Sequence, residues 1–248
     1  IGISDWLPIA FSFFLFSRVL LNPPGKSRKL GLLRTQECFT WNTRLLRPGS
    51  RHPIIGPSFL RARFHMVKLV ILDRDGVINR DSDAYIKSLS EWHPYPSAIE
   101  AIARLHQNGW TVAIATNQSG IGRGYYDIRT LEQIHDRLRS LVEQAGGKIA
   151  AIEYCPHLPS DDCACRKPRT GLLERIKGRL HLQTLEGCWM VGDSLRDIQA
   201  GITSGCQTAL VLTGKGQRSR HELDDTLADT WICNDLADFT SRLLNQSS

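Results

Sequence analysis

The chain has 248 residues, seven cysteines and a formal net charge of +6. The positive charge is concentrated in residues 1–65, which hold ten Lys and Arg against two acidic residues, whereas residues 66–248 are slightly acidic. Because the part of the chain with regular hydrophobic patterning has no excess of positive charge, the composition argues against a nucleic-acid-binding protein. Seven cysteines in a chain of this length do not indicate a disulfide scaffold.

Residues 1–65 show no sustained helical or strand periodicity. Residues 6–21 are apolar, but Pro8 and Arg18 interrupt them, and a membrane span needs about 20 apolar residues. The positive charges follow this stretch, whereas those of a signal peptide precede it. The first methionine is Met66. We therefore expect residues 1–65 to lie outside the native fold, as translated sequence upstream of a start at Met66, with a membrane-surface anchor as the alternative.

From residue 66 onward, short apolar runs alternate with amphipathic segments of helical spacing. The runs predict strands at residues 67–72, 110–115, 149–154, 188–191 and 208–212, and an edge strand at 231–233. The segments between them predict helices at residues 97–108, 129–144, around 172–176, at 195–203 and around 236–243. This alternation predicts one α/β domain over residues 66–248, with a doubly wound, mostly parallel sheet and helices on both faces.

Asp73 and Asp75 follow the first expected strand. Residues i and i+2 of a strand point the same way, so both carboxylates are expected beyond its carboxyl end, the edge where ligands bind in open α/β sheets. Two carboxylates this close repel one another. The pair makes physical sense if a divalent cation lies between them, or if one attacks while the other transfers protons. Taken alone, the motif is also compatible with an ordinary turn.

Three further polar motifs also follow expected strands. The hydroxyl of Thr116, followed by free backbone N–H groups near a helix start, is suited to holding a phosphate. Arg166 offers a planar fork and Lys167 a point charge for the same kind of ligand. Asp193 ends a buried strand, where an unpaired carboxylate would be costly. Each motif alone has a plain alternative: a turn, a solvated basic pair, or, for Asp197, an acid in a first helical turn.

The third expected strand leads into the sequence Cys155-x-His157-x5-Cys163-x-Cys165. Three thiolates and one imidazole suit a closed tetrahedral Zn²⁺ site, which would be structural because no coordination position stays open. The loop runs directly into Arg166, so zinc would fix the charges that follow. A chance cluster of reduced cysteines is the alternative.

In this order, and each at a strand end, the four polar motifs resemble those of the haloacid dehalogenase superfamily of phosphotransferases. The resemblance implies a Rossmann-like fold, with Asp73 as a nucleophile that becomes phosphorylated and Asp75 as the acid and base. It further implies that Thr116 and Lys167 hold the phosphoryl oxygens. Mg²⁺ would be held by the Asp73 carboxylate, the Asp75 backbone carbonyl and Asp193. Asp at position 75, where ion-pumping relatives carry Thr, implies a phosphatase.

The zinc loop and the short connection at residues 79–96, which leaves no room for a cap domain, resemble a capless subgroup of this superfamily. It comprises heptose 1,7-bisphosphate 7-phosphatases and histidinol-phosphate phosphatases. The chain resembles the heptose enzymes more closely. It departs from them at two positions: Gly122 stands where they usually carry Ala, and Ser194 stands where they often carry Lys. The resemblance implies substrate contacts from surface loops, by Asn79, Asp81, Asn117, Gln118, Ser119, Arg123 and Arg166.

The resemblance implies a cytoplasmic hydrolase that uses Mg²⁺ and Zn²⁺. We expect it to be a monomer and to have no nucleic-acid or membrane partner. Its small-molecule substrate would be a sugar bisphosphate, the 7-phosphate of which is removed on the way to lipopolysaccharide precursors. Arg166 and Arg123 would hold the distal phosphate. Two alternatives remain at this point: a histidinol-phosphate phosphatase, and a zinc-bearing binding module that uses its basic N-terminus on RNA or membrane and does not catalyse.

Overall fold

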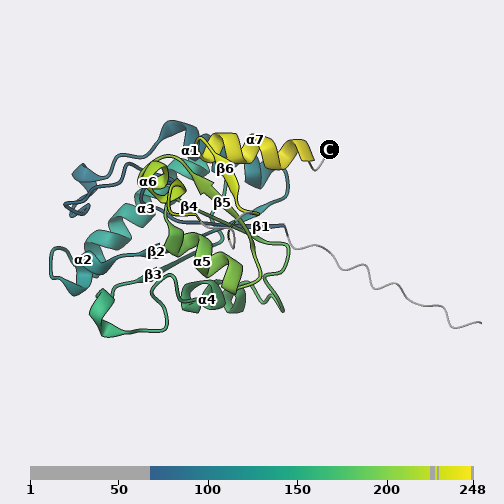
Figure 1. Cartoon of the computed structure of the whole chain (residues 1–248). Helices are drawn as coiled ribbons and strands as arrows, with labels where there is room; N and C mark the ends of the chain where they lie inside the picture. Colours follow the sequence, from purple (N-terminus) through teal and green to yellow (C-terminus); the bar gives the residue numbers. More distant parts are fainter. Residues whose placement is uncertain (1–67, 224–226, 228, 247–248) are drawn as a thin grey trace, which may run out of the picture. The chain divides into compact units, whose positions relative to one another are not determined.

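A computed structural model describes residues 68–223, 227 and 229–246 (Figure 1). These residues form a six-stranded sheet in the order β3-β2-β1-β4-β5-β6. Every neighbouring pair of strands is parallel, so the predicted α/β fold with a mostly parallel sheet is confirmed. The strands are β1 (Leu69–Leu72), β2 (Thr111–Asn117), β3 (Ala151–Cys155), β4 (Trp189–Gly192), β5 (Gln207–Val211) and β6 (Trp231–Cys233).

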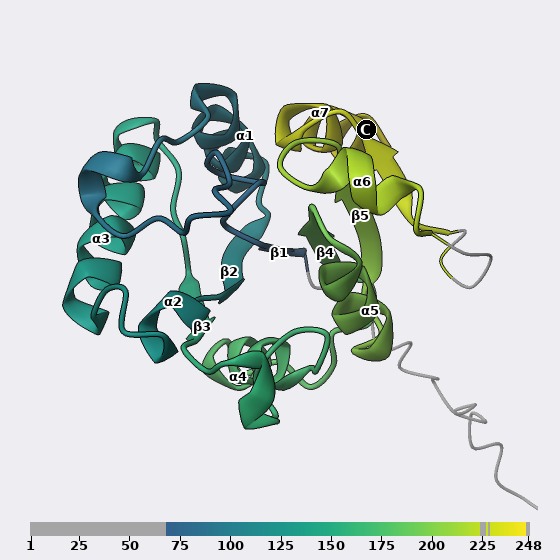
Figure 2. The ribbon, with the colours of Figure 1, turned by 60° about the vertical axis from the view of Figure 1, so that its left-hand side comes forward.

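Helices cover both faces of this sheet, with α1, α3 and α7 on one face and α4 and α5 on the other (Figure 2). The short helices α2 and α6 follow β2 and β5 at the carboxyl ends of these strands. The helices are α1 (Pro96–Gln107), α2 (Ser119–Gly122), α3 (Ile128–Gln144), α4 (Gly171–Arg179), α5 (Leu195–Thr203), α6 (Gly216–Arg220) and α7 (Leu236–Gln246), with 3-10 turns at Leu89–Glu91 and Pro159–Asp161.

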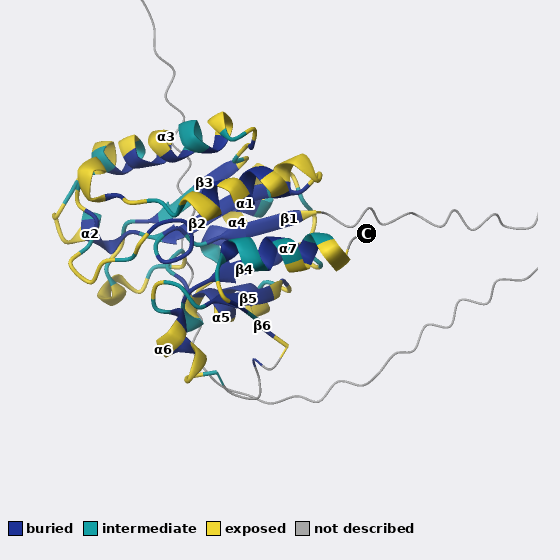
Figure 3. Cartoon of the chain, turned by 90° about the horizontal axis from the view of Figure 1, so that it is seen from above, coloured by how far each residue is buried: buried dark blue, intermediate teal, exposed yellow. Residues whose placement is uncertain are grey.

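Strand β1 is apolar at every position because both of its faces are covered. Val70 and Leu72 pack against the cluster that includes α1, α3 and α7, whereas Leu69 and Ile71 pack against the cluster that includes α4. All four side chains are completely buried, as is most of the sheet in Figure 3. Burial of this kind stabilises the fold by about 1.5–3 kcal/mol per side chain. Since β2 lies on one side of β1 and β4 on the other, the chain after β1 emerges at the topological switch point.

The predicted elements match the structure to within a few residues at their ends, and α5 and β6 have the predicted bounds. Strand β2 continues to Asn117, so Thr116 lies inside the strand and not after it. Helices α2 and α6 were not predicted, because four or five residues are too few to show a helical period. The predictions for residues 1–65 concern a segment outside the described residues. Among the helices that are described, none has the length and apolar character needed to cross a membrane.

His135, on α3, is a polar side chain enclosed within the fold. Its exposed fraction is 1 %, and neither ring nitrogen has a hydrogen-bond partner. The carboxylate of Glu132 is 3.9 Å away, too far for a hydrogen bond. Burial, together with the positive charges of Arg74 and Arg139, lowers the pKa of His135 from 6.5 to about 3. The imidazole is therefore neutral in the folded protein at any pH near neutrality.

This lowered pKa predicts an acid sensitivity that a single substitution removes. The unfolded chain binds a proton at His135 below about pH 6.5 and the folded chain does not, so stability falls as the pH drops below that value. Between pH 7.5 and pH 5.0, the wild-type protein should lose about 2 kcal/mol more unfolding free energy than His135→Leu. Urea denaturation at both pH values measures this difference. His106→Leu, which replaces an exposed imidazole on α1, is the control and should behave as wild type does.

Candidate functional site

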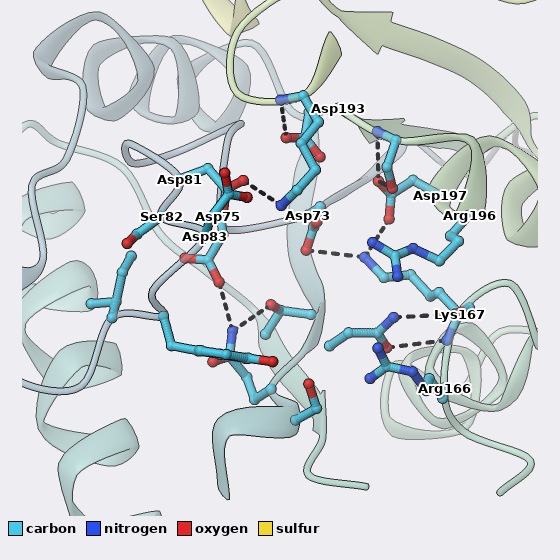
Figure 4. Close-up of a pocket in the computed structure, with 18 of the residues that line it drawn as sticks. Asp73, Asp75, Asp81, Ser82, Asp83, Arg166, Lys167, Asp193, Arg196 and Asp197 are labelled. Carbon is cyan, nitrogen blue, oxygen red and sulfur yellow. Dashed lines mark hydrogen bonds and ion pairs between the residues drawn. The ribbon is translucent and has the colours of Figure 1, made fainter. Parts of the chain in front are cut away.

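Most of the residues predicted for catalysis, substrate binding and Mg²⁺ line one cavity of about 260 Å³ at the carboxyl ends of the central strands (Figure 4). Asn79 and Arg123 are the predicted substrate-binding residues that do not line it. Asn79 is completely buried, and the guanidinium of Arg123 lies 5.9 Å from the ring centre of Tyr85, which does line the cavity. The predicted residues among those that line the cavity are Asp73, Asp75, Asp81, Thr116, Asn117, Gln118, Ser119, Arg166, Lys167 and Asp193.

Lys167 lies at the centre of this arrangement, with only 1 % of its surface exposed. Its Nζ is 3.0 Å from Asp73 Oδ1 and 2.6 Å from Asp197 Oδ1, and it donates to the carbonyl of Ala115. Figure 4 shows the ammonium reaching between the two carboxylates. Burial alone would lower the pKa of Lys167, but the charges of Asp197 and Asp73 outweigh it and raise that pKa. The lysine is therefore a buried, permanent positive charge.

Side chains from two other segments fix the position of Lys167. The Asn117 amide donates to the carbonyl of Lys167 and accepts from its backbone N–H, each at 3.1 Å. Asp197 is held at the start of α5 by a capping box, in which the backbone N–H and the hydroxyl of Ser194 donate to Asp197 Oδ2. From the sequence alone, Asp197 was expected only as an acid in a first helical turn. The structure shows that its other oxygen also pairs with the lysine.

Three side chains donate hydrogen bonds to the carboxylate of Asp75. Arg74 contacts both oxygens at 2.8–3.0 Å, Asn79 Nδ2 lies 2.9 Å from Oδ1, and Gln118 Nε2 lies 2.9 Å from Oδ2. Although burial raises the pKa of Asp75, the charge of Arg74 and these hydrogen bonds outweigh it and lower that pKa. The amides of Asn79 and Gln118, which were predicted to contact substrate, each donate to Asp75 and to one further protein oxygen, the carbonyl of Arg80 and the hydroxyl of Thr116 respectively. The predicted contact of Asn79 with substrate is not supported by its place in the fold.

The carboxylates of Asp73, Asp193 and Asp197 lie close enough for a metal ion, with one oxygen of each within 4.8 Å of the others. Burial and the neighbouring negative charges raise the pKa of Asp193 to about 8. Burial also raises the pKa of Asp73, to about 6, against the opposing charge of Lys167. A cation between Asp73 and Asp193 would relieve both. Both oxygens of Asp197 are engaged, Oδ1 by Lys167 and Oδ2 by Ser194, whereas Asp73 contacts Lys167 through Oδ1. The pair Asp73 and Asp193 therefore fits a hard cation such as Mg²⁺.

Two glycines let the backbone approach Asp193 closely. A Cβ on Gly76 would lie 1.9 Å from Asp193 Oδ2, and one on Gly214 would lie 2.2 Å from the same oxygen. Gly76 also has a φ of +82°, which other residues rarely adopt. The carboxylate further accepts from the backbone N–H of Lys215 at 2.8 Å. The loops after β1 and β5 thus enclose the Asp193 carboxylate, and no larger side chain fits at either glycine.

The Cys and His residues of the predicted zinc site come together after β3. The three sulfurs are 3.2–3.5 Å apart, and His157 Nδ1 is 3.5 Å from the sulfur of Cys155 and 3.2 Å from that of Cys165. Donors about 2.3 Å from a tetrahedral zinc would be separated by about 3.7 Å, so this set is near that geometry. The cluster therefore fits a metal with thiolate and imidazole ligands.

Several residues of the site could not be found from sequence patterns. Arg196, on α5, lines the cavity beside Arg166, and the repulsion between the two guanidiniums contributes, after burial, to a lowered pKa of Arg166. Lys215 closes one side of the cavity through an ion pair with Asp81. Tyr126 also lines it. Lys215 and Tyr126 belong to none of the predicted motifs, and Arg196 lies within the motif after β4 but was given no role there. For Arg196, a weak signal was its place one turn from the predicted Asp193.

Comparisons with known proteins agree with this geometry. A family model described as HAD-hydrolase-like matches residues 164–239. The D-glycero-beta-D-manno-heptose-1,7-bisphosphate 7-phosphatase of Pseudomonas aeruginosa is 57% identical over 177 residues, which cover 71% of this chain and 97% of that enzyme. The enzyme of the same name from Bordetella bronchiseptica is 48% identical over 181 residues, covering 73% of this chain and all of that enzyme.

Solved structures are similar as well. The crystal structure of D,D-heptose 1.7-bisphosphate phosphatase from B. bronchiseptica, complexed with magnesium and phosphate, aligns with a TM-score of 0.68 and 48% identity, over 72% of this chain and 99% of that one. The corresponding phosphatase from Burkholderia thailandensis aligns with a TM-score of 0.55 and 37% identity, over 71% of this chain and 98% of that one.

Proposed function

Because this chain belongs to the heptose 1,7-bisphosphate 7-phosphatase family of the haloacid dehalogenase superfamily, we propose that it hydrolyses the 7-phosphate of D-glycero-D-manno-heptose 1,7-bisphosphate. The observation that carries this proposal is the approach of Lys167 Nζ to within 3.0 Å of Asp73 Oδ1, in a cavity that Asp75, Thr116 and Asp193 also line. Relatives at 47–57% identity are heptose enzymes, so the histidinol-phosphate alternative is not favoured. A binding module without catalysis would have no need of this arrangement.

The reaction proceeds in two in-line displacements. A carboxylate oxygen of Asp73 forms a bond to the phosphorus while the bond from phosphorus to the sugar oxygen breaks, and Asp75 in its carboxylic-acid form gives a proton to that oxygen. Because Arg74 and the hydrogen bonds lower the pKa of Asp75, this form is the minor one in the free protein. Water then attacks the phosphorus of the aspartyl phosphate, Asp75 takes a proton from the water, and the bond to Asp73 breaks. Lys167 and Thr116 hold the phosphoryl oxygens in both steps.

A bound Mg²⁺ supplies positive charge against the repulsion between the Asp73 carboxylate and the phosphate dianion. The carboxylates of Asp73 and Asp193 and the backbone carbonyl of Asp75 would hold it. A structural zinc ion held by the three thiols and His157 would fix the loop that carries Arg166 and Lys167. Because thiols bind zinc only when they are reduced, the cluster supports a reducing, cytoplasmic location.

The distal phosphate of the substrate is held by Arg166 and Arg196. Both line the cavity, and their mutual repulsion is relieved when a dianion lies between them. Among the described residues neither guanidinium pairs with a carboxylate, and Arg166 donates to the carbonyl of His157 at 3.3 Å. Arg123, which the sequence suggested for this role, does not line the cavity. Its guanidinium lies over the ring of Tyr85.

The proposed reaction is tested by phosphate release from the heptose bisphosphate, with and without Mg²⁺. Wild-type protein should release one phosphate per sugar and leave the 1-phosphate, as followed by ³¹P NMR. Asp73→Asn keeps the shape of the side chain but removes the nucleophile, and should lower kcat by about 10³-fold or more. Activity that survives in this variant, or faster loss of the anomeric phosphate, would contradict the proposal.

Removing either distal arginine should weaken binding of a bisphosphate selectively. A charge-assisted hydrogen bond is worth about 1.5–3 kcal/mol, so Arg166→Ala and Arg196→Ala should each raise KM for the bisphosphate by roughly 10- to 100-fold. KM for p-nitrophenyl phosphate, which carries one phosphate, should change little. Arg139→Ala, which breaks an ion pair with Asp136 on the outer face of α3, is the control. Equal losses for both substrates would exclude the distal role.

The zinc proposal is tested by metal content and thermal stability. Purified wild-type protein should contain about one zinc per chain, and Cys163→Ser should lose it. If loss of the zinc costs Cys163→Ser about 2 kcal/mol of unfolding free energy, its Tm should fall by about 4–8 °C, given the size of the domain. Cys206→Ala, a buried thiol outside the cluster, is the control and should retain the metal. Equal zinc content in the two variants would show that the cluster does not bind it.

A further inference from the structure

The amide of Gln118 links three side chains of the cavity. Its Nε2 donates to Asp75 Oδ2 at 2.9 Å and to Thr116 Oγ1 at 2.8 Å, while its Oε1 accepts from the hydroxyl of Tyr126 at 2.5 Å. Only 3 % of the Gln118 surface is exposed. The contact with Thr116 is buried and the contacts with Asp75 and Tyr126 are partly buried, and hydrogen bonds between protein groups are stronger there than in water.

These contacts determine which way the Gln118 amide is turned. In the opposite orientation the amide oxygen would face the Asp75 carboxylate, and two acceptors would repel one another. The hydroxyl of Tyr126 donates to Oε1 only if it keeps its proton. Burial raises the pKa of Tyr126 to about 12; the positive charge of Arg74 opposes this shift and the negative charge of Asp75 adds to it. The hydroxyl is therefore a neutral donor.

Tyr126 is itself placed by the backbone beside it. A Cβ on Gly120 would lie 2.3 Å from Tyr126 Cε1, so the ring fits only because residue 120 is glycine. The backbone of Gln118 is fixed as well, since its N–H donates to the carbonyl of Cys155 at 2.7 Å. The hydroxyl of Tyr126 thus meets an amide whose main chain is anchored to β3, and the remaining freedom of that amide is its side-chain rotation.

We propose that Tyr126 is a positioning residue which, through Gln118, fixes the plane of the Asp75 carboxylate for proton transfer. Thr116 anchors the second hydrogen of the same amide. Arg74 and Asn79 hold the Asp75 carboxylate from the buried side, and Gln118 holds it from the cavity, so the loss of the Gln118 contact lets the carboxylate turn out of the plane needed for proton transfer. The proposal rests on the proposed function only in requiring that Asp75 transfers a proton to a sugar alkoxide.

The substitution Tyr126→Phe tests this proposal because it removes one hydroxyl and keeps the ring. Loss of a single positioning hydrogen bond should lower kcat about tenfold, while KM stays within about twofold and Tm is unchanged. Tyr125→Phe is the matched control. It makes the same change one residue earlier, on an exposed ring that packs against Tyr85, and should leave kcat as in wild type. An unchanged kcat in Tyr126→Phe overturns the proposal.

Two further measurements separate positioning of Asp75 from a general structural role. The double variant Tyr126→Phe, Gln118→Leu should be no slower than Gln118→Leu alone, because Tyr126 acts through the amide. The loss in kcat/KM from Tyr126→Phe should be smaller for p-nitrophenyl phosphate, whose leaving group needs little protonation, than for an alkyl phosphate. Additive losses in the double variant, or equal losses for the two esters, overturn the proposal.

The same assays distinguish a failure of this inference from a failure of the proposed function. If wild-type protein cleaves other alkyl phosphates but not the heptose bisphosphate, the proposed substrate is wrong and Tyr126 is still judged on those esters. If the heptose bisphosphate is cleaved and Tyr126→Phe is as fast as wild type, only the inference fails. Protein that cleaves no phosphate ester refutes both.

Discussion

The site depends on one buried positive charge, the ammonium of Lys167. The parallel sheet brings the carboxylates of Asp73, Asp193 and Asp197 to the same edge, where they repel one another and lose their hydration. Lys167 lies between Asp73 and Asp197 and offsets part of this cost. An unpaired lysine would be equally costly there, so the acids and the base require each other. The anchoring of Lys167 by Asn117 shows that its position, and not only its charge, is specified.

The alternation of strands and helices could be predicted because each long element repeats its hydrophobic pattern several times. The continuous apolar run of β1 indicated a strand covered on both faces, and the helices on the two faces confirm this. The helix predicted at residues 195–203 has the same bounds in the structure, as α5. Helices α2 and α6 could not be predicted, since they are shorter than two helical periods and are held by the tight turns around them. The enclosure of His135 was not predicted, although helical spacing puts it on the same face as Leu131, Leu138 and Val142.

Part of the candidate site followed from a simple geometric rule. Parallel strands end at a common edge, so Asp73, Thr116 and Asp193 had to meet there once the strands were recognised. The cysteines and histidine could be predicted to cluster because their spacing leaves few other uses for them. The role of Gln118 could not be predicted in the same way. A motif gives the identity of a side chain, but whether its amide faces the substrate or the neighbouring carboxylate depends on contacts such as that with Tyr126. Arg196 was missed because its use depends on the proximity of Arg166 in space.

The lining of the cavity has a consequence for inhibitor design. Apart from Ile86 and two tyrosines, almost every side chain that borders it carries a charge or a strong hydrogen-bonding group. A neutral, largely apolar compound would strip water from these groups and offer too little in exchange, so its affinity would be poor. Effective inhibitors should therefore carry formal negative charge at two separated points, as in bisphosphonates or disulfonates. Such compounds cross membranes badly, and the design problem for this enzyme is delivery more than affinity.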